Sequence, residues 1–209
     1  MLNIAVYGEH TLSVNAICRL LDDEIAFNPQ AIKPGNEYKR LYTEQTRQDV
    51  IVYCVNGYSN TLFKEVEKLH RHAPKIKKVL IISMAHNQFI KKLLKAGIDS
   101  IVSYTCTPEE LTQAIQYAIL NQQFISHDLS QMIIKNKYPS CFNSLSQREL
   151  EITYMLANGM NVKTVSSELD ISPKTVNTYR YRIFNKLDID RNIDLFRMVS
   201  QEAAYMLQA

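Results

Sequence analysis

The sequence predicts an α/β doubly wound domain with a five-stranded parallel sheet, followed by a smaller all-α domain of four helices. Short apolar runs alternate with helical patterns through residues 1–120. Several of these runs are apolar on both faces, which is typical of parallel strands that helices cover on both sides. Beyond about residue 145 the patterns are helical alone. A chain of 209 residues has room for two domains of these kinds.

The first domain is expected to span residues 1–122. Runs rich in β-branched and apolar residues predict four strands, and a weaker pattern predicts a fifth. In chain order the five are residues 3–7, 24–32, 49–54, 79–83 and 100–103. A helical pattern at residues 12–21 follows the first strand. Thr107, Pro108 and Glu110 have the spacing of an N-cap, a first-turn proline and a capping-box glutamate, so they predict a helix that runs to about Leu120.

Residues 123–143 are polar and are interpreted as a linker with room for a short helix. The second domain, residues 144–209, begins with the capping box Ser146–Glu149, and Asn158-Gly159 ends that helix. A second helix fits residues 162–169. Ser172-Pro173 starts a third that runs to about Leu187, and a fourth covers roughly residues 192–207.

Composition excludes several classes of protein. With 46% hydrophobic and 22% charged residues, the chain has an ordinary globular composition. No apolar run reaches the ~20 residues of a membrane span, and the N-terminus resembles a strand instead of a signal peptide, so we expect a cytoplasmic protein with no membrane partner. The cysteines and histidines lack metal-ligand spacing, so we expect no metal. We also expect no cofactor and no enzymatic activity. The four cysteines are Cys18, Cys54, Cys106 and Cys141.

The third helix of the second domain indicates binding to DNA. Between Lys174 and Leu187 it has four basic residues and no acidic one, whereas the net charge of the whole chain is only +3. Its apolar side is formed by Val176, Tyr179, Ile183 and Leu187. Its opposite side carries Lys174, Asn177, Thr178, Tyr181, Arg182 and Asn185. A merely solvated face is the alternative, but the short helix and tight turn before it favour a helix-turn-helix that reads the major groove.

Three segments of the second domain resemble the C-terminal DNA-binding domain of the LuxR/FixJ/NarL family, and in particular GacA/UvrY-type response regulators of two-component systems. They are Leu145–Glu151, Asn158-Gly159 and Ile171–Arg182. The resemblance extends through Phe124-Ile125-Ser126, Gly97 and Pro108, so it covers almost the whole chain.

This resemblance implies how the second domain meets its partners. It places base contacts on Asn177, Thr178 and Tyr181. It places phosphate contacts on Lys174, Thr175, Arg180, Arg182 and Lys186. In this family the last helix commonly forms a dimer interface, for which the candidates here are Leu195, Met198 and Val199; that these three are ordinary core residues is an equally good interpretation. The implied partner is double-stranded promoter DNA, bound by a homodimer.

The same resemblance makes the first domain a receiver, with a flavodoxin-like fold, whose phosphorylation pocket is degenerate. The positions that match the pocket are Gly8, Glu9, Cys54, Ser83 and Tyr104. Cys54 stands where the family has its phosphorylated aspartate, and Tyr104 stands where it has a lysine. One carboxylate is left where a Mg²⁺ site needs three, so aspartyl phosphorylation and metal binding are expected to be absent.

The expected function is therefore sequence-specific transcription regulation that does not depend on aspartyl phosphorylation. An alternative is an interaction module that forms heterodimers with an intact response regulator and modulates it. A redox role for Cys54 and phosphorylation of His10 are further alternatives. A thiol at a strand end is more often a small buried hydrophobe, and no cation adjacent in sequence lowers its pKa.

Overall fold

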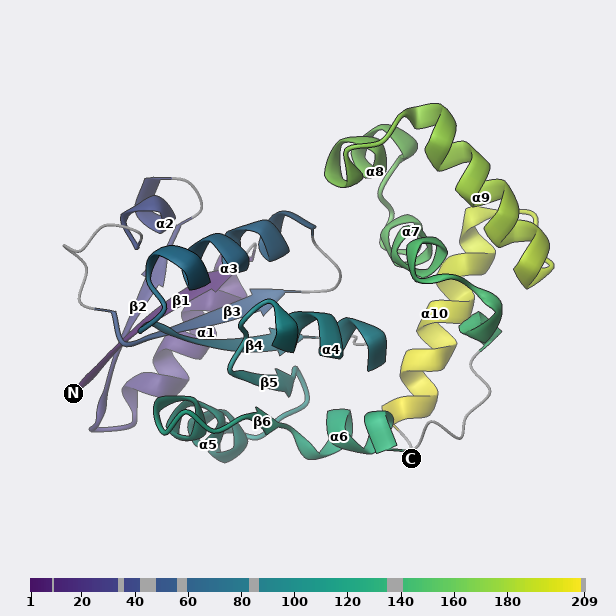
Figure 1. Cartoon of the computed structure of the whole chain (residues 1–209). Helices are drawn as coiled ribbons and strands as arrows, with labels where there is room; N and C mark the ends of the chain where they lie inside the picture. Colours follow the sequence, from purple (N-terminus) through teal and green to yellow (C-terminus); the bar gives the residue numbers. More distant parts are fainter. Residues whose placement is uncertain are drawn as a thin grey trace. The chain divides into compact units, whose positions relative to one another are not determined.

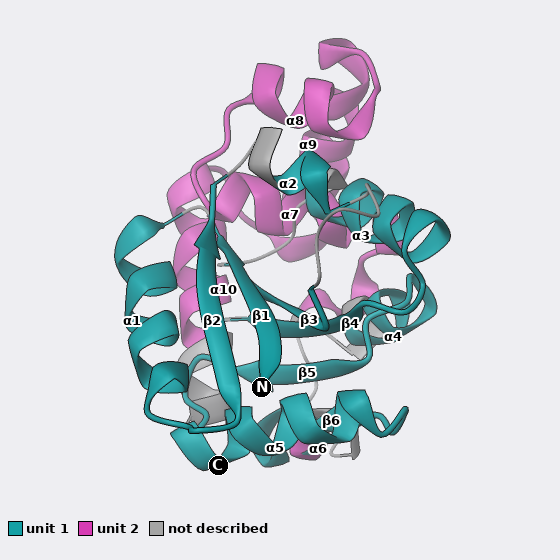
Figure 2. Cartoon of the chain, turned by 90° about the vertical axis from the view of Figure 1, so that its left-hand side faces the viewer, with its two compact units in different colours: residues 1–56, 62–130 teal, residues 57–61, 131–209 magenta. Residues whose placement is uncertain are grey.

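The computed structural model describes residues 1–8, 10–33, 36–41, 48–55, 60–82, 87–134 and 141–207. The chain divides into two compact units, residues 1–56 with 62–130 and residues 57–61 with 131–209 (Figure 2). The division falls inside helix α6, His127–Ile134, within the predicted linker. None of the described helices is long and apolar enough to cross a bilayer.

The first unit contains a parallel sheet in the order β2-β1-β3-β4-β5-β6 (Figure 1). The strands are β1 Leu2–Gly8, β2 Phe27–Ile32, β3 Val50–Val55, β4 Lys77–Ile82, β5 Ser100–Ser103 and β6 Phe124–Ile125. The first five are the predicted strands. Strand β2 lies on one side of β1, and β3, which follows β2 in the chain, lies on its other side. The direction of winding therefore reverses at β1, and the sheet is doubly wound, as expected.

The predicted count of five strands is wrong, because β6 adds a sixth inside the segment interpreted as linker. Its two residues pair with Ser100 and Ile101 of β5. The ring of Phe124 lies 5.5 Å from the ring of Tyr117. A strand of two residues has no periodic pattern of its own, so its existence depends on the neighbouring strand.

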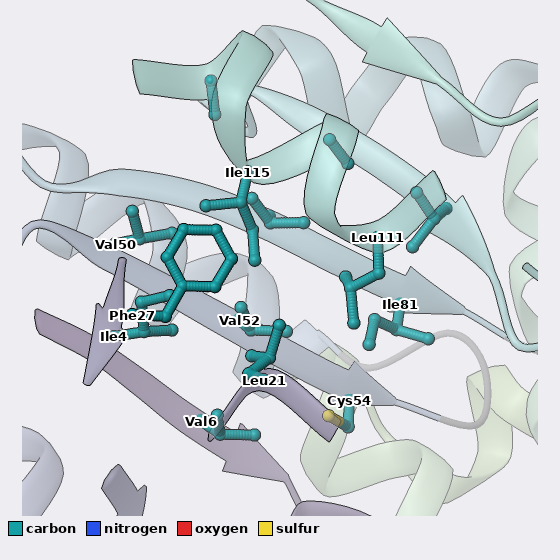
Figure 3. Packing of buried hydrophobic residues seen from close by; sticks show 14 of the residues in the cluster. Ile4, Val6, Leu21, Phe27, Val50, Val52, Cys54, Ile81, Leu111 and Ile115 are labelled. Carbon is teal, nitrogen blue, oxygen red and sulfur yellow. The ribbon is translucent and has the colours of Figure 1, made fainter. Parts of the chain in front are cut away.

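Helices cover both faces of the sheet (Figure 2). The helices α1, Thr11–Asp22, and α5, Pro108–Ile119, pack on one face. On that side the core is built from alternate strand residues, among them Ile4, Val6, Val50, Val52 and Cys54 (Figure 3). The opposite face is covered by α3, Asn60–His72, and α4, Asn87–Lys95. A short helix, α2, spans Asn36–Arg40.

The second unit contains the four predicted helices, preceded by a 3₁₀ turn, Cys141–Ser144, that was not expected. They are α7 Gln147–Ala157, α8 Val162–Leu169, α9 Pro173–Leu187 and α10 Asn192–Leu207. Ser146 and Glu149 form the predicted capping box of α7. Phe142 of the 3₁₀ turn is buried, and its ring lies 6.1 Å from that of Tyr154.

Candidate nucleic-acid interface

Helices α8 and α9 are joined by a three-residue turn whose geometry is fixed by local hydrogen bonds. Asp170 adopts the left-handed conformation with φ 53° and ends α8. The Ser166 hydroxyl donates to the Ile171 carbonyl at 2.6 Å. Ser172 is the N-cap of α9, and its hydroxyl oxygen accepts from the Thr175 backbone N–H at 3.0 Å. A short helix, a tight turn and a capped second helix form the predicted helix-turn-helix.

The two sides of α9 are divided as the sequence predicts. Val176, Ile183 and Leu187 are buried against the rest of the unit. The three residues predicted to contact bases, Asn177, Thr178 and Tyr181, are all exposed. Tyr181 keeps 69% of its surface in solvent, which is unusual for an aromatic side chain beside an otherwise polar helix face. The Thr178 hydroxyl donates to the Lys174 carbonyl at 3.0 Å, so its methyl group and lone pairs are what it can offer to a base.

The five predicted phosphate contacts differ in their surroundings. Lys174 and Arg182 are exposed on the same side of α9 as the predicted base contacts. The Arg180 guanidinium lies 5.1 Å from the centre of the Phe184 ring, and the Thr175 hydroxyl lies 2.8 Å from that of Ser172. Lys186 forms an ion pair with Glu149 through a 2.7 Å bond. The structure therefore gives Lys186 a role inside the protein, and its phosphate contact stays a prediction.

The first turn of α7 holds both helices of the helix-turn-helix. The Arg148 guanidinium donates to the carbonyl of Leu169, the last residue of α8, at 3.1 Å. Its other nitrogen forms a 3.0 Å ion pair with Glu151. Lys186, near the end of α9, donates to Glu149 and to the Ser144 carbonyl at 3.1 Å. The contacts made to α8 and α9 join residues 21 to 42 positions apart, so no local pattern could have revealed them.

The predicted dimer residues on α10 are mostly inside the unit. Leu195 and Val199 are buried and Met198 is half-buried, which favours the interpretation as core that the sequence left open. The neighbouring Ile193 and Phe196 are 47% and 53% exposed. An apolar surface on α10 therefore exists, but on residues that the sequence did not single out.

Two of the positions predicted to form the degenerate pocket, Gly8 and Cys54, lie side by side at the ends of β1 and β3. A Cβ added to Gly8 would lie 2.8 Å from the Cys54 carbonyl oxygen and 3.0 Å from its Cβ, so the two strands approach too closely for a side chain at Gly8. Glu9 and Ser83, also predicted for this pocket, lie outside the described residues. Within the described part of the chain, no cluster of His, Cys, Asp or Glu could hold a metal ion.

The third described position of this pocket, Tyr104, follows β5. It is 37% exposed, and its backbone N–H donates to the Ile82 carbonyl at 3.1 Å. Next to it the hydroxyls of Ser103 and Thr105 lie 2.6 Å apart, and Thr105 donates to the Asp128 carboxylate at 2.8 Å. This carboxylate belongs to α6, and it accepts from the hydroxyls of Thr105 and Ser126 and from the Leu129 backbone N–H.

Cys54 has the surroundings of an inert thiol. Its side chain is buried in the α1–α5 side of the core (Figure 3). Burial, and to a smaller extent Cys18, raises the pKa of the Cys54 thiol to about 12. The thiolate is the reactive form of cysteine, so almost none is present near neutral pH. These surroundings count against the redox role that was left open.

We expect native Cys54 to resist alkylation by iodoacetamide at pH 8 and to react fully once urea unfolds the chain. Half-buried Cys18 is the internal control, because it is more accessible. Peptide mass spectrometry after timed labelling compares the two rates. Equal labelling of both thiols in the native protein would restore the redox hypothesis.

Proteins of known type are similar in sequence to this chain over nearly its full length. Residues 143–199 match the family described as bacterial regulatory proteins, luxR family. The chain is 32% identical over 200 residues to response regulator GacA of Pseudomonas aeruginosa, which covers 93% of this chain and 94% of the relative. The chain belongs to the LuxR family of response regulators. It is 29% identical to response regulator UvrY of Escherichia coli, with 93% and 92% covered.

As a LuxR-family response regulator, the chain is a DNA-binding transcription regulator and not an enzyme. Solved structures share its fold. RcsB of Salmonella enterica serovar Typhimurium, bound to the rprA promoter with BeF₃⁻, has a TM-score of 0.71 at 17% identity and covers 96% of this chain and 99% of its own. A structure of two RcsB dimers on parallel DNAs has a TM-score of 0.56 at 20% identity, with 95% and 98% covered.

Proposed function

We propose that this response regulator acts in the cytoplasm as a dimer that binds promoter DNA without aspartyl phosphorylation. The observation that carries the proposal is the buried thiol of Cys54 at the position that matches the family's phosphorylated aspartate. A protonated thiol has no carboxylate oxygen to form an acyl phosphate. The tight contact between Gly8 and Cys54 further supports it, because no acidic side chain fits beside the thiol at this position.

The proposal assigns sequence readout to Asn177, Thr178 and Tyr181, and phosphate binding first of all to Lys174 and Arg182. These five side chains are exposed on one side of a helix that is anchored at both ends. An exposed amide can pair with adenine through two hydrogen bonds, and exposed cations displace counterions from the backbone. Dimerisation is assigned to the exposed apolar residues Ile193 and Phe196 of α10. RcsB is described on DNA as a dimer, which supports the same arrangement here.

We expect the untreated chain to bind selected promoter DNA specifically. Asn177→Ala should lower the preference for the selected site over a scrambled duplex by roughly 5- to 150-fold, the range of a good base contact. Arg182→Ala should weaken binding to both duplexes alike, and it should reduce the slope of log K against log salt by about 0.9. Fluorescence anisotropy over a salt series, on duplexes obtained by genomic selection, measures both effects.

Matched controls are available on the same unit. Asn185→Ala changes the same residue type on the exposed side of α9, further toward its C-terminal end, and Arg197→Ala removes an exposed arginine from α10. Asn185→Ala should leave the selectivity for the site unchanged, and Arg197→Ala should leave the affinity and the salt slope unchanged. Acetyl phosphate with Mg²⁺ should change neither the mass of the protein nor its affinity. Tight binding only after such treatment would overturn phosphorylation independence. Weak, sequence-blind binding that a related response regulator rescues would favour the heterodimer alternative.

A further inference from the structure

The two covered faces of the first unit carry opposite charges. On one side, α3, α4 and the turn after α3 contain seven basic residues and two acidic ones, Glu65 and Glu67. The seven are Lys64, Lys68, Arg71, Lys75, Lys91, Lys92 and Lys95. On the other side, α1, the turn after it and α5 contain one basic residue, Arg19, and five acidic ones. The five are Asp22, Asp23, Glu24, Glu109 and Glu110. The net charges are therefore 7 − 2 = +5 and 1 − 5 = −4.

The cations of α3 share one exposed stripe. Leu62, Val66 and Leu69 are buried against the sheet. Lys64, Lys68 and Arg71 follow one another at spacings of four and three residues, which places them on one face of a helix, here the one opposite the buried residues. All three are exposed, as is Lys75 in the turn beyond the helix. The stripe from Lys64 to Arg71 extends for about 10 Å at ~1.5 Å per residue.

Helix α4 continues this surface. The Lys92 ammonium lies 4.8 Å from the centre of the Phe63 ring of α3. A Cβ added to Gly97, just after α4, would lie 2.6 Å from the His70 ring of α3. The two helices are therefore neighbours. Exposed Lys91 and Lys95 add two more cations.

We define the α3–α4 basic face as Lys64, Lys68, Arg71, Lys75, Lys91 and Lys95. Among the described residues, no ion pair neutralises Lys64, Lys75, Lys91 or Lys95, whereas Lys77 and Lys78 near the start of β4 both pair with Asp99. The sole exposed carboxylate on α3 is that of Glu67. The six cations of this face outnumber the four basic residues of α9.

We infer that the α3–α4 basic face is a second DNA contact, which binds the phosphate backbone of duplex DNA beside the site that α9 reads. This inference rests on the DNA binding of the proposed function. DNA carries one charge per ~1.7 Å of helix axis, and each cation that meets a phosphate releases condensed counterions. Since phosphate contacts carry no base information, this face adds affinity and not selectivity.

A competing partner for this face is the acidic α1–α5 side of a second copy, which carries the net charge of −4 given above. Pairing basic face to acidic face would be head-to-tail, and such contacts repeat into open chains unless the rotation closes into a ring. Duplex DNA has a higher and more regular charge density, and it is already a partner of this family. The observations therefore favour DNA.

The test compares two full-length triple variants that lose the same charges. The face variant is Lys64→Gln/Arg71→Gln/Lys75→Gln. The matched control is Arg19→Gln/Lys33→Gln/Lys39→Gln, which removes one arginine and two lysines from exposed positions outside α3 and α4. Anisotropy titrations with the selected site in duplexes of ~18 and ~40 base pairs are run from 50 to 200 mM salt. Sedimentation velocity without DNA reports self-association.

For the long duplex, we expect the face variant to bind at least about tenfold more weakly at 50 mM salt than the wild type. Its log–log salt slope should be smaller by about 2.7, from ~0.9 for each of the three lost phosphate contacts. Its preference for the selected over a scrambled site should stay within about twofold of the wild-type preference. On the short duplex, its loss of affinity relative to the wild type should be smaller than on the long one. The log–log salt slope of the control variant should be closer to that of the wild type than the slope of the face variant is.

Equal slopes for face variant and control would overturn the inference while leaving the proposed function intact. Loss of wild-type self-association in the face variant, with unchanged DNA binding, would instead assign the face to a second copy and would also overturn it. If the wild type itself binds neither duplex, the proposed function fails. Circular dichroism confirms that both variants remain folded.

Discussion

Replacing Gly8 by aspartate is expected to destabilise the first unit by about 3 kcal/mol, toward the upper end for overpacking in a core. The new Cβ would meet three atoms: the Cys54 carbonyl oxygen at 2.8 Å, the Cys54 Cβ at 3.0 Å and Val14 Cγ2 at 3.1 Å. β1 and β3 pair directly inside the sheet, so the carbonyl cannot move without breaking strand register. The added carboxylate would also be placed against a buried thiol.

Urea unfolding of the full-length chain, followed by far-ultraviolet circular dichroism, measures this loss. Gly159→Asp is the control, because Gly159 has φ +82° but no atom within 4 Å of an added Cβ. Its cost should be about 1 kcal/mol, from the backbone conformation alone. Gly8→Asp with the stability of the control would show that β1 and β3 can separate to admit a side chain.

The close packing at Gly8 also leaves no room for an acidic residue of the phosphorylation pocket. Position 8 matches one of the two acidic residues of the receiver family, and a carboxylate there requires more space than this packing leaves. Cys54→Asp alone would therefore supply a phosphoacceptor while Glu9 remained the single acidic residue of the pair that matches the family's two. This packing supports the proposal that control by phosphorylation is absent.

Replacing Glu149 by glutamine should destabilise the second unit by about 2 kcal/mol. The Glu149 carboxylate is almost fully buried and accepts from the Lys186 ammonium and from the Ser146 backbone N–H, both at 2.7 Å. Glutamine keeps an acceptor for Ser146 but loses the charge that holds α9 against α7. The cost is moderated because the Lys186 side chain is 40% exposed and can be hydrated when the pair is broken.

This contribution should depend on pH with a definite sign. Burial alone would raise the pKa of Glu149, but hydrogen bonds from Lys186 and Ser146 outweigh it, so the pKa lies below the ordinary value. The stabilisation is therefore fully present above the unfolded pKa of about 4.3 and is lost as the pH falls through the lower, folded value. The difference between wild type and variant should be constant from about pH 7 to 5 and should shrink below about pH 4.

Chemical unfolding at several pH values, followed by circular dichroism, measures this difference. Asp190→Asn, which removes an exposed carboxylate from the same unit, is the control and should change stability little. A Glu149→Gln penalty that is small at pH 7, or that grows as the pH falls toward 4, would contradict the role of the ion pair.

The sequence by itself determined the elements whose signal is local. Strands such as β3 and β4 are continuous apolar runs, and Thr107, Ser146 and Ser172 act as N-caps through residues three positions away. The exposed and buried sides of α9 follow from helical periodicity alone. For this reason the helix-turn-helix and its exposed polar residues could be predicted residue by residue.

The tertiary structure alone decided which distant residues meet. Strand β6 exists because β5 offers it an edge, and Lys186 lies beside Glu149 although 37 residues separate them. On α10, the packing against α7 decided that Leu195 is core while Phe196 is exposed. Two helices distant in sequence from α9 combine into the α3–α4 basic face. A sequence pattern records the period of one element, whereas these features depend on the partner that each element acquires when the chain packs.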